Sequence, residues 1–213
     1  MPSPFTPGFV KICGVTTVED GVFVGQLGAR ALGLNLADSS PRKVTLEVAR
    51  EIAAATKGAL VRCAVFRGRD DDAILEDLEG LDVDAVQLHD GISALLLKDL
   101  RARTLLVIKA LNVEGSDFLD FDEHRVDAVL VDGPNPGSGV AHSWTRLAQR
   151  RFEVPVIAAG GLTPSNVADV IVATSVTGVD TATGVERRPG IKDHEAVRSF
   201  VANARRAFAS REQ

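Results

Sequence analysis

The sequence is poor in cysteine and has no long apolar run. Its 213 residues include two cysteines, Cys13 and Cys63, which excludes a disulfide scaffold and a cysteine-rich zinc site. Two cysteines in a reducing compartment are most simply free thiols. No segment reaches the roughly 18 uninterrupted apolar residues of a transmembrane helix. The four histidines lie far apart without HExxH-type spacing, so we expect no metal site.

Excess positive charge is absent as well. Lys and Arg number 24 against 29 Asp and Glu, which gives a net charge of -5. A mildly acidic chain is poorly suited to bind nucleic acid through its overall field. The amino terminus has no basic segment followed by an apolar run, so we expect no secretory signal, no membrane partner and a cytoplasmic location.

Short apolar segments rich in Val, Ile, Leu and Ala alternate with helical patterns. Most of the segments lack period-two alternation, which is typical of strands buried on both faces of a parallel sheet. We predict strands at residues 9–12, 31–36, 61–66, 85–88, 105–110, 128–131, 155–159 and 178–181. Helices are predicted at 18–27, 45–56, 70–78, 93–100, 117–125, 143–150, 165–173 and 193–208. N-caps are expected at Asp70, Ser93, Ser143, Ser165 and Asp193.

Eight strand–helix units predict an α/β fold, a single-domain (β/α)8 TIM barrel over residues 1–213. Residues 1–8 are rich in proline and are expected to form a flexible lead-in. The alternative is an open doubly wound sheet, which normally stops at about five or six strands.

Active sites of such barrels lie on the loops that follow the strands. That rule selects Cys13 and Gly14, residues 38–42 with Arg42, residues 89–91 with His89, Asn112, Asp132, Gly160 and Gly161, and residues 183–186 with Thr183 and Gly184. The two glycine-containing turns, 160–161 and 183–184, favour a phosphate site, because their backbone N–H groups can point at an anion. The other interpretation is that these glycines only make tight turns.

Each selected side chain also has a structural interpretation. Cys13 could be an inert buried thiol and Asp132 a loop cap. Arg42 could bind a carboxylate bidentately or stay in solvent. His89 is most simply a hydrogen-bonded pocket residue, with metal ligand and base as alternatives. Lys109 could form a Schiff base, although pairing with a carboxylate is favoured.

Seven segments together resemble phosphoribosylanthranilate isomerase, the enzyme family of the tryptophan pathway. They are Lys11-Ile-Cys-Gly-Val-Thr, Ser40-Pro-Arg, Gln87-Leu-His, Ile108-Lys-Ala, Val131-Asp132, Ala159-Gly-Gly-Leu-Thr-Pro-Ser-Asn-Val, and Gly178-Val-Asp-Thr-Ala-Thr-Gly-Val-Glu with Pro189-Gly-Ile-Lys-Asp. The matches run from the first strand to the last helix. The first and the last two are specific in their order and spacing.

The resemblance implies an Amadori rearrangement of N-(5′-phosphoribosyl)anthranilate to 1-(2-carboxyphenylamino)-1-deoxyribulose 5-phosphate, without a cofactor. It implies Cys13 as general base, Asp132 as general acid and Arg42 as the group that holds the anthranilate carboxylate. His89 would line the substrate pocket, and the turns at 160–161 and 183–184 would hold the phosphate. The expected partner is thus a phosphorylated small molecule. A monomer is the default, because no heptad or apolar surface stripe suggests a dimer.

The residue types fit this chemistry. An acid must protonate the ribose ring oxygen, and a thiolate can then remove the C2′ proton of the resulting Schiff base. A carboxyl group that ends an apolar strand is expected to have a raised pKa, which suits an acid. A nearby cation would lower the pKa of the Cys13 thiol, but the sequence leaves open whether Lys11 points toward it.

Three departures from the family pattern stand out; the first two are expected to bear on substrate fit, and the third is tolerated because the backbone makes most of the phosphate contacts. Asp90 stands between Gln-Leu-His and Gly91, Pro136-Gly-Ser-Gly replaces a Gly-Gly-Thr-Gly loop, and Ala182-Thr183 stands where the family usually has serine. One rival function is the histidine-pathway sugar isomerase or a bifunctional barrel, which uses aspartate in place of Cys13 and needs a second phosphate site. The other is a non-catalytic barrel that binds a phosphorylated ligand, which would have lost Cys13 or Asp132.

Overall fold

Eight parallel strands close into a barrel in the computed structural model, which describes residues 3–133 and 144–211. The strands follow one another around the ring in chain order: β1 (Phe9–Cys13), β2 (Ala31–Asn35), β3 (Val61–Phe66), β4 (Ala85–Leu88), β5 (Leu106–Asn112), β6 (Ala128–Asp132), β7 (Val156–Ala158) and β8 (Gly178–Thr181). Pairing of β1 with β8 closes the ring and sets Lys11 beside Asp180. The predicted (β/α)8 barrel is confirmed.

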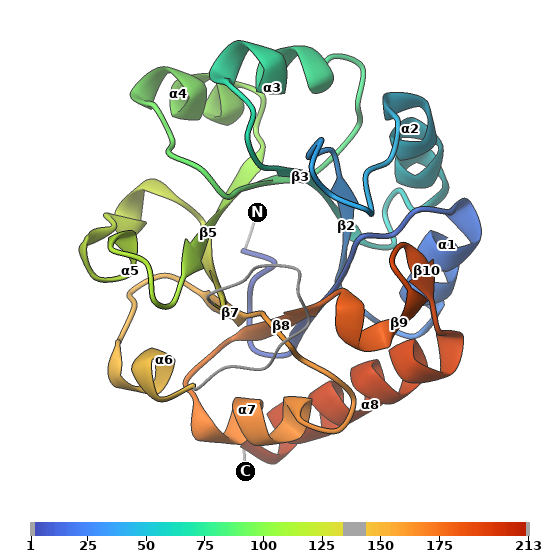
Figure 1. The fold of residues 1–213 in the computed structure, drawn as a ribbon, viewed down its shortest axis with the longest axis vertical. Helices are drawn as coiled ribbons and strands as arrows, with labels where there is room; N and C mark the ends of the chain where they lie inside the picture. The colour runs from blue at the N-terminus through green and yellow to red at the C-terminus, as the bar shows by residue number, and fades with distance from the viewer. Residues whose placement is uncertain (1–2, 134–143, 212–213) are drawn as a thin grey trace.

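Helices surround the strands on the outside of the ring (Figure 1). They are α1 (Val18–Gln26), α2 (Leu46–Ala55), α3 (Asp71–Asp77), α4 (Ala94–Ala102), α5 (Asp117–Asp120), α6 (Thr145–Gln149), α7 (Val167–Ala173) and α8 (His194–Arg211), with the 3-10 turns η1 (Glu123–Arg125) and η2 (Thr183–Val185). Within residues 3–133 and 144–211, no helix is long and apolar enough to cross a membrane.

Side-chain caps fix most of the predicted helix starts. Asp70, Ser93 and Asp193 accept hydrogen bonds from backbone N–H groups of the following turn, as predicted. The prediction for Ser165 is wrong, because Asn166 and not Ser165 directly precedes α7. The Ser165 hydroxyl instead hydrogen-bonds within the preceding loop. The predicted cap Ser143 lies outside the described residues.

Two segments differ from the predicted elements. The helix predicted over 117–125 is interrupted, because Asp122 caps the separate turn η1 instead of continuing α5. After η2 the chain forms an unpredicted antiparallel hairpin of β9 (Glu186–Arg188) and β10 (Ile191–Lys192). These strands are too short to produce a readable alternation of polar and apolar residues.

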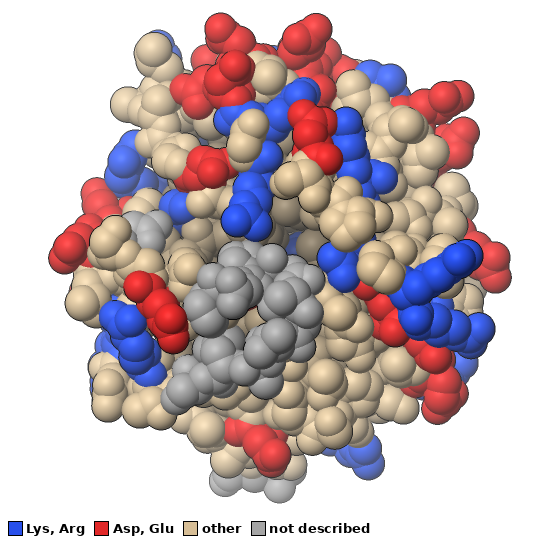
Figure 2. Space-filling model, viewed as in Figure 1, with Lys and Arg blue, Asp and Glu red and all other residues tan. Residues whose placement is uncertain are grey.

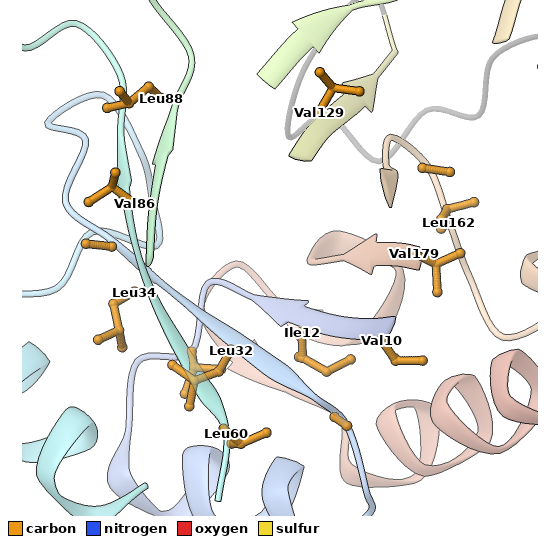
Figure 3. Close-up of a cluster of buried hydrophobic side chains, with 14 of the residues drawn as sticks. Val10, Ile12, Leu32, Leu34, Leu60, Val86, Leu88, Val129, Leu162 and Val179 are labelled. Atoms are coloured by element: carbon orange, nitrogen blue, oxygen red, sulfur yellow. The ribbon is translucent and has the colours of Figure 1, made fainter. Parts of the chain in front are cut away.

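The strands are buried on both faces, which is why most of them lack alternation. Side chains on their outer faces pack between the sheet and the helices, and Figure 3 labels Val10, Ile12, Leu32, Leu34, Val86, Leu88, Val129 and Val179 among them. A second apolar cluster fills the barrel itself and includes Phe9, Val65, Ile108, Leu130 and Ile157.

The described part of the predicted lead-in is anchored by Phe5. This side chain is 1% exposed and packs edge-to-face on Phe9, with 5.1 Å between the ring centroids. The start of the chain accordingly lies across the centre of the ring in Figure 1. Burying a phenylalanine of this kind contributes about 1.5–3 kcal/mol to stability. Phe5 and Phe9 thus fill the interior of the barrel at its amino-terminal end.

Candidate active site

A cavity lies at the carboxyl ends of the strands. Its wall contains eight residues that the strand-end rule selected and the resemblance carried forward: Cys13, Arg42, His89, Asp132, Gly160, Gly161, Thr183 and Gly184. Other residues selected by the same rule do not line it, namely Gly14, Asp38, Asp90, Gly91, Asn112, Val185 and Glu186. Figure 2 shows this face of the molecule, where Lys and Arg atoms border the centre. Within the described segments, no three His, Cys, Asp or Glu side chains are placed to hold a metal ion.

A buried ion pair lies directly beneath Cys13. Lys11 and Cys13 are two residues apart on β1, so both side chains point into the barrel. Lys11 is fully buried, and its Nζ lies 3.0 Å from Asp180 Oδ1 on β8. A Cβ at Gly33 would lie 2.7 Å from Cys13 Sγ and 3.2 Å from Lys11 Nζ. The thiol and the ammonium group therefore both lie against the bare backbone of Gly33, which answers the open question of where Lys11 points.

Burial and charge act in opposite directions on Cys13. Burial raises the pKa of its thiol, and the positive charge of Lys11 opposes that rise. Burial by itself would lower the pKa of Lys11, but the Asp180 carboxylate and the nearby thiols raise it above its ordinary value, so the cation is permanent. Cys63, farther down the barrel on β3, has a thiol pKa raised to about 12 by burial. Cys63 does not line the cavity wall.

Arg42 is held by a second ion-pair network. Its Nε and Nη2 donate to both carboxylate oxygens of Glu186 at 2.8–3.0 Å, and Nη2 also donates to Thr183 Oγ1 at 2.9 Å. Lys192 donates to Glu186 Oε1 at 2.9 Å and to the Cys13 carbonyl at 2.6 Å. Burial alone would raise the pKa of Glu186, but Arg42 and Lys192 bring it below its ordinary value. The β9–β10 hairpin thus fixes both Arg42 and the backbone of Cys13.

Asp132 ends β6 and is 8% exposed. Its Oδ1 accepts a hydrogen bond of 2.8 Å from the N–H of Gly133. A Cβ at Gly160 would lie 2.5 Å from that same oxygen, so the absence of a side chain there lets the β7 turn approach the carboxylate. The acid candidate and the first glycine turn are therefore in direct contact.

Both glycine turns depend on glycine. Gly160 and Gly161 have φ of +87° and +69°, values that L side chains rarely adopt. A side chain at Gly184 would collide with the carbonyl oxygen of Leu162, and Thr181 Oγ1 donates to that carbonyl at 2.7 Å. The β7 and β8 turns are thereby packed together, with their backbone along one stretch of the cavity wall.

His89 lies on the β4 side of the cavity. Its Nε2 is 3.0 Å from Gln87 Nε2, and its carbonyl accepts a hydrogen bond of 2.8 Å from Lys109 Nζ. Lys109 also donates to the Ala110 carbonyl at 2.8 Å. Burial, together with the charges of Arg67, Lys11 and Lys109, lowers the pKa of His89 to about 4. Its imidazole is neutral at physiological pH.

The strand-end rule did not select three polar residues that shape this site: Asp180, Lys192 and Arg67. It did select Glu186, but not as the partner of Arg42. Strand alternation relative to Cys13 could have placed Lys11, and hence a counter-charge on the adjoining β8. Lys192 lies in the motif Pro189-Gly-Ile-Lys-Asp, but its place beside the Cys13 carbonyl depends on the unpredicted hairpin. Arg67 follows β3, the one strand after which the rule selected no residue.

Comparisons of this chain with known proteins all point to one family. Residues 10–203 match the family model described as N-(5′-phosphoribosyl)anthranilate (PRA) isomerase. The N-(5′-phosphoribosyl)anthranilate isomerase of Paracoccus denitrificans is 37% identical over 206 residues, which cover 92% of this chain and 96% of that protein.

Solved structures agree with the sequence comparison. The phosphoribosyl anthranilate isomerase of Thermus thermophilus superposes with a TM-score of 0.79 at 35% identity, covering 92% of this chain and 97% of that one. A phosphoribosyl anthranilate isomerase in complex with reduced 1-(o-carboxyphenylamino)-1-deoxyribulose 5-phosphate superposes with a TM-score of 0.80 at 31% identity, covering 92% and 97%.

Proposed function

This chain belongs to the N-(5′-phosphoribosyl)anthranilate isomerase family, and we propose that Cys13 and Asp132 are the base and the acid of its reaction. The enzyme converts N-(5′-phosphoribosyl)anthranilate to 1-(2-carboxyphenylamino)-1-deoxyribulose 5-phosphate in tryptophan biosynthesis. The observation that carries the assignment of roles is that the thiol and the carboxyl group line one cavity beside the two glycine turns.

The reaction needs one proton donated and one removed. Asp132, as the acid, protonates the ribose ring oxygen while the anilino nitrogen displaces the C–O bond. The Schiff base that forms makes the C2′ proton acidic, and the Cys13 thiolate removes it. The enolamine then tautomerises to the ketone. Each proton transfer by a positioned group typically contributes about 10²–10⁴-fold to the rate.

Lys11 stabilises the thiolate form of Cys13 in a buried site. Burial alone would hold the Cys13 proton tightly, and the ammonium group beside Sγ favours the thiolate. Asp180 keeps Lys11 in place and charged. The base is thus assisted by a fixed cation below it, while the cavity lies above.

The substrate is held at its phosphate by the backbone of the β7 and β8 turns, at Gly160, Gly161, Thr183 and Gly184. Arg42 contributes Nη1, the edge of its guanidinium that Glu186 and Thr183 leave open, to the anthranilate carboxylate. His89 lines the pocket as a neutral imidazole. The phosphate contacts are tested by Gly184→Ala, which should raise KM, against Gly91→Ala, where a Cβ meets nothing within 4 Å.

The decisive experiment is the pH dependence of kcat/KM, followed by the fall in anthranilate fluorescence. The wild-type profile should be bell-shaped, with limbs that belong to the coupled pair of Cys13 and Asp132. Asp132→Asn should lose most activity and one limb, yet still bind the reduced product analogue. Wild-type kcat/KM in Asp132→Asn across the pH range would assign the acid to another group, with His89 next. The histidine-pathway substrate, assayed in parallel, should not be turned over.

The enzyme is proposed to be a cytoplasmic monomer. No apolar stripe or heptad in the sequence calls for a partner subunit, and the amino terminus has no basic segment followed by an apolar run. Light scattering during size-exclusion chromatography tests the monomer directly, because a dimer would double the measured mass.

A further inference from the structure

Arg67 is a cation of the cavity wall to which the described residues give no partner. It follows β3 in the inward-facing series of Cys63 and Val65, and it is exposed at the mouth. Within residues 3–133 and 144–211 the other arginine of the wall, Arg42, forms an ion pair with Glu186. Arg67 has no hydrogen bond or ion pair in that same part of the chain. Its guanidinium is available to an anion that enters the cavity.

Gln87 supplies a second, independent sign of a ligand at the same place. Its side chain is 2% exposed and lines the cavity, and its Oε1 has no hydrogen-bond partner in the described structure. Its Nε2 lies 3.0 Å from His89 Nε2. If the Gln87 amide were turned so that its oxygen and nitrogen exchanged places, the oxygen would face His89 Nε2 and the nitrogen would be left without a partner. A buried amide with an unmet hydrogen bond costs stability, and a ligand group can supply the missing partner.

These residues lie on the opposite side of the ring from the two glycine turns. Strand order around the ring sets β3 and β4 across the barrel from β7 and β8. A substrate whose phosphate lies on the β7 and β8 turns therefore extends its other end toward Arg67 and Gln87. That end carries an aromatic carboxylate and, beside it, an anilino N–H.

Charge balance favours the same placement. The substrate brings a phosphate and a carboxylate into a cavity where Asp132 and Asp180 already supply negative charge. Asp180 is neutralised by Lys11, and the single carboxylate of Glu186 is shared by Arg42 and Lys192, which leaves one positive charge in that group. Arg67 adds a further positive charge to the described wall on the β3 side. An incoming phosphate and carboxylate thus meet positive charge at two places.

We propose that Arg67 and Gln87 form a subsite for the anthranilate end of the substrate. Arg67 binds the carboxylate together with the open edge of Arg42, and the Gln87 amide pairs with the anilino N–H. Neutral His89 supports the subsite by holding the Gln87 amide in place. This inference rests on the proposed function, and it adds a specificity-determining arginine that the family motifs in this sequence do not contain.

Binding measurements test the subsite without relying on turnover. Two inhibitors are titrated calorimetrically: the reduced product analogue, and the same compound with the ring carboxylate replaced by hydrogen. Arg67→Met should weaken the first about tenfold, the lower end for a hydrogen bond to a charged group, and leave the second unchanged. Arg67→Lys should recover part of the loss. Arg151→Met, at an exposed arginine outside the cavity wall, should bind both as the wild type does.

Each outcome of these titrations either supports or overturns the proposed subsite. Equal weakening of both inhibitors in Arg67→Met would overturn the carboxylate assignment, since the arginine would then act on the phosphate or on the loop. Unchanged binding of both would show that Arg67 is a solvent-exposed residue. Gln87→Leu should weaken both inhibitors, because both keep the anilino N–H, and unchanged binding would remove Gln87 from the subsite. Failure of the proposed function is a separate result, a wild type that binds both inhibitors but isomerises no substrate.

Discussion

The two sides of the cavity differ in how their polar groups are paired. On the side formed by β8, β1 and the hairpin, which we term the paired side, Lys11, Asp180, Arg42, Glu186 and Lys192 satisfy one another before any ligand is bound. On the side formed by β3 and β4, the open side, Arg67, Gln87 and His89 keep unused charge or hydrogen-bonding capacity. On the paired side, fixed ion pairs hold the surroundings of Cys13 in place, whereas on the open side Arg67 and Gln87 are left available to a ligand.

The largest expected effect belongs to the thiol on the paired side. Cys13→Ala should lower kcat by about 10²–10⁴-fold, because a general base contributes that much, and the fold should remain intact by circular dichroism. Cys63→Ala is the matched control and should leave the rate nearly unchanged, since Cys63 lies inside the barrel. Equal losses in the two variants would mean that the thiols act through packing alone.

Removing a cation from the paired side should cost stability. Lys11→Met leaves Asp180 buried without its partner, which is expected to lower the free energy of unfolding in urea by about 3–5 kcal/mol. It should also slow alkylation of Cys13 by iodoacetamide near neutral pH, because the thiolate loses its cation. Lys43→Met breaks the exposed pair with Asp38 and should leave the urea midpoint unchanged. Matching losses in Lys11→Met and Lys43→Met would refute the distinction between buried and exposed pairs.

Arg42 makes its ion pair on the paired side, and the open edge of its guanidinium is proposed to bind the substrate. Arg42→Ala should raise KM by roughly 10–100-fold, equivalent to about 1.5–3 kcal/mol for a hydrogen bond to a charged group. The change should appear mainly in KM if the contact is equally strong in the ground and transition states. An unchanged KM, with unchanged inhibition by the product analogue, would leave Arg42 with a structural role only.

The smallest effect concerns the neutral imidazole of the open side. Because its pKa is about 4 in the folded protein and about 6.5 when unfolded, His89 contributes stability that is fully present above about pH 6.5 and is lost as the pH falls toward 4. Between about pH 8 and pH 5.5 the loss should be about 1.4 kcal/mol. His89→Gln should remove this part of the pH dependence. Identical curves for the two proteins would contradict the lowered pKa.

The paired and open sides also differ in what the sequence could reveal. The strand-end rule placed Cys13 and Asp132 correctly around one cavity, because position after a buried strand is a property of local sequence. The pairing of Lys11 with Asp180 depends on ring closure between residues 169 positions apart, which no local pattern reports. The β9–β10 hairpin escaped detection for a different reason, since its strands are too short to show a pattern, and the contact of Lys192 with Cys13 was missed with it.

The helix boundaries show the limit of capping signals. Asp70, Ser93 and Asp193 act as caps because each precedes a helix with an apolar face that packs on the barrel. Ser165 has the same residue type, yet its hydroxyl is engaged by Thr163 in the turn that follows β7. Competition between a loop hydrogen bond and a cap is settled by the surrounding fold, so composition alone could not place that helix start.

The bond from Lys192 to the Cys13 carbonyl has a consequence for how the enzyme matures. The two residues are 179 positions apart, at 2.6 Å between Nζ and the carbonyl oxygen. During synthesis β1 is made first. It cannot pair with β8 or contact the hairpin until almost all of the remaining chain has been made. Contacts of such long range form late, because loop closure must precede them. Regain of enzymatic activity should therefore be among the last events of refolding, after most helical structure has returned.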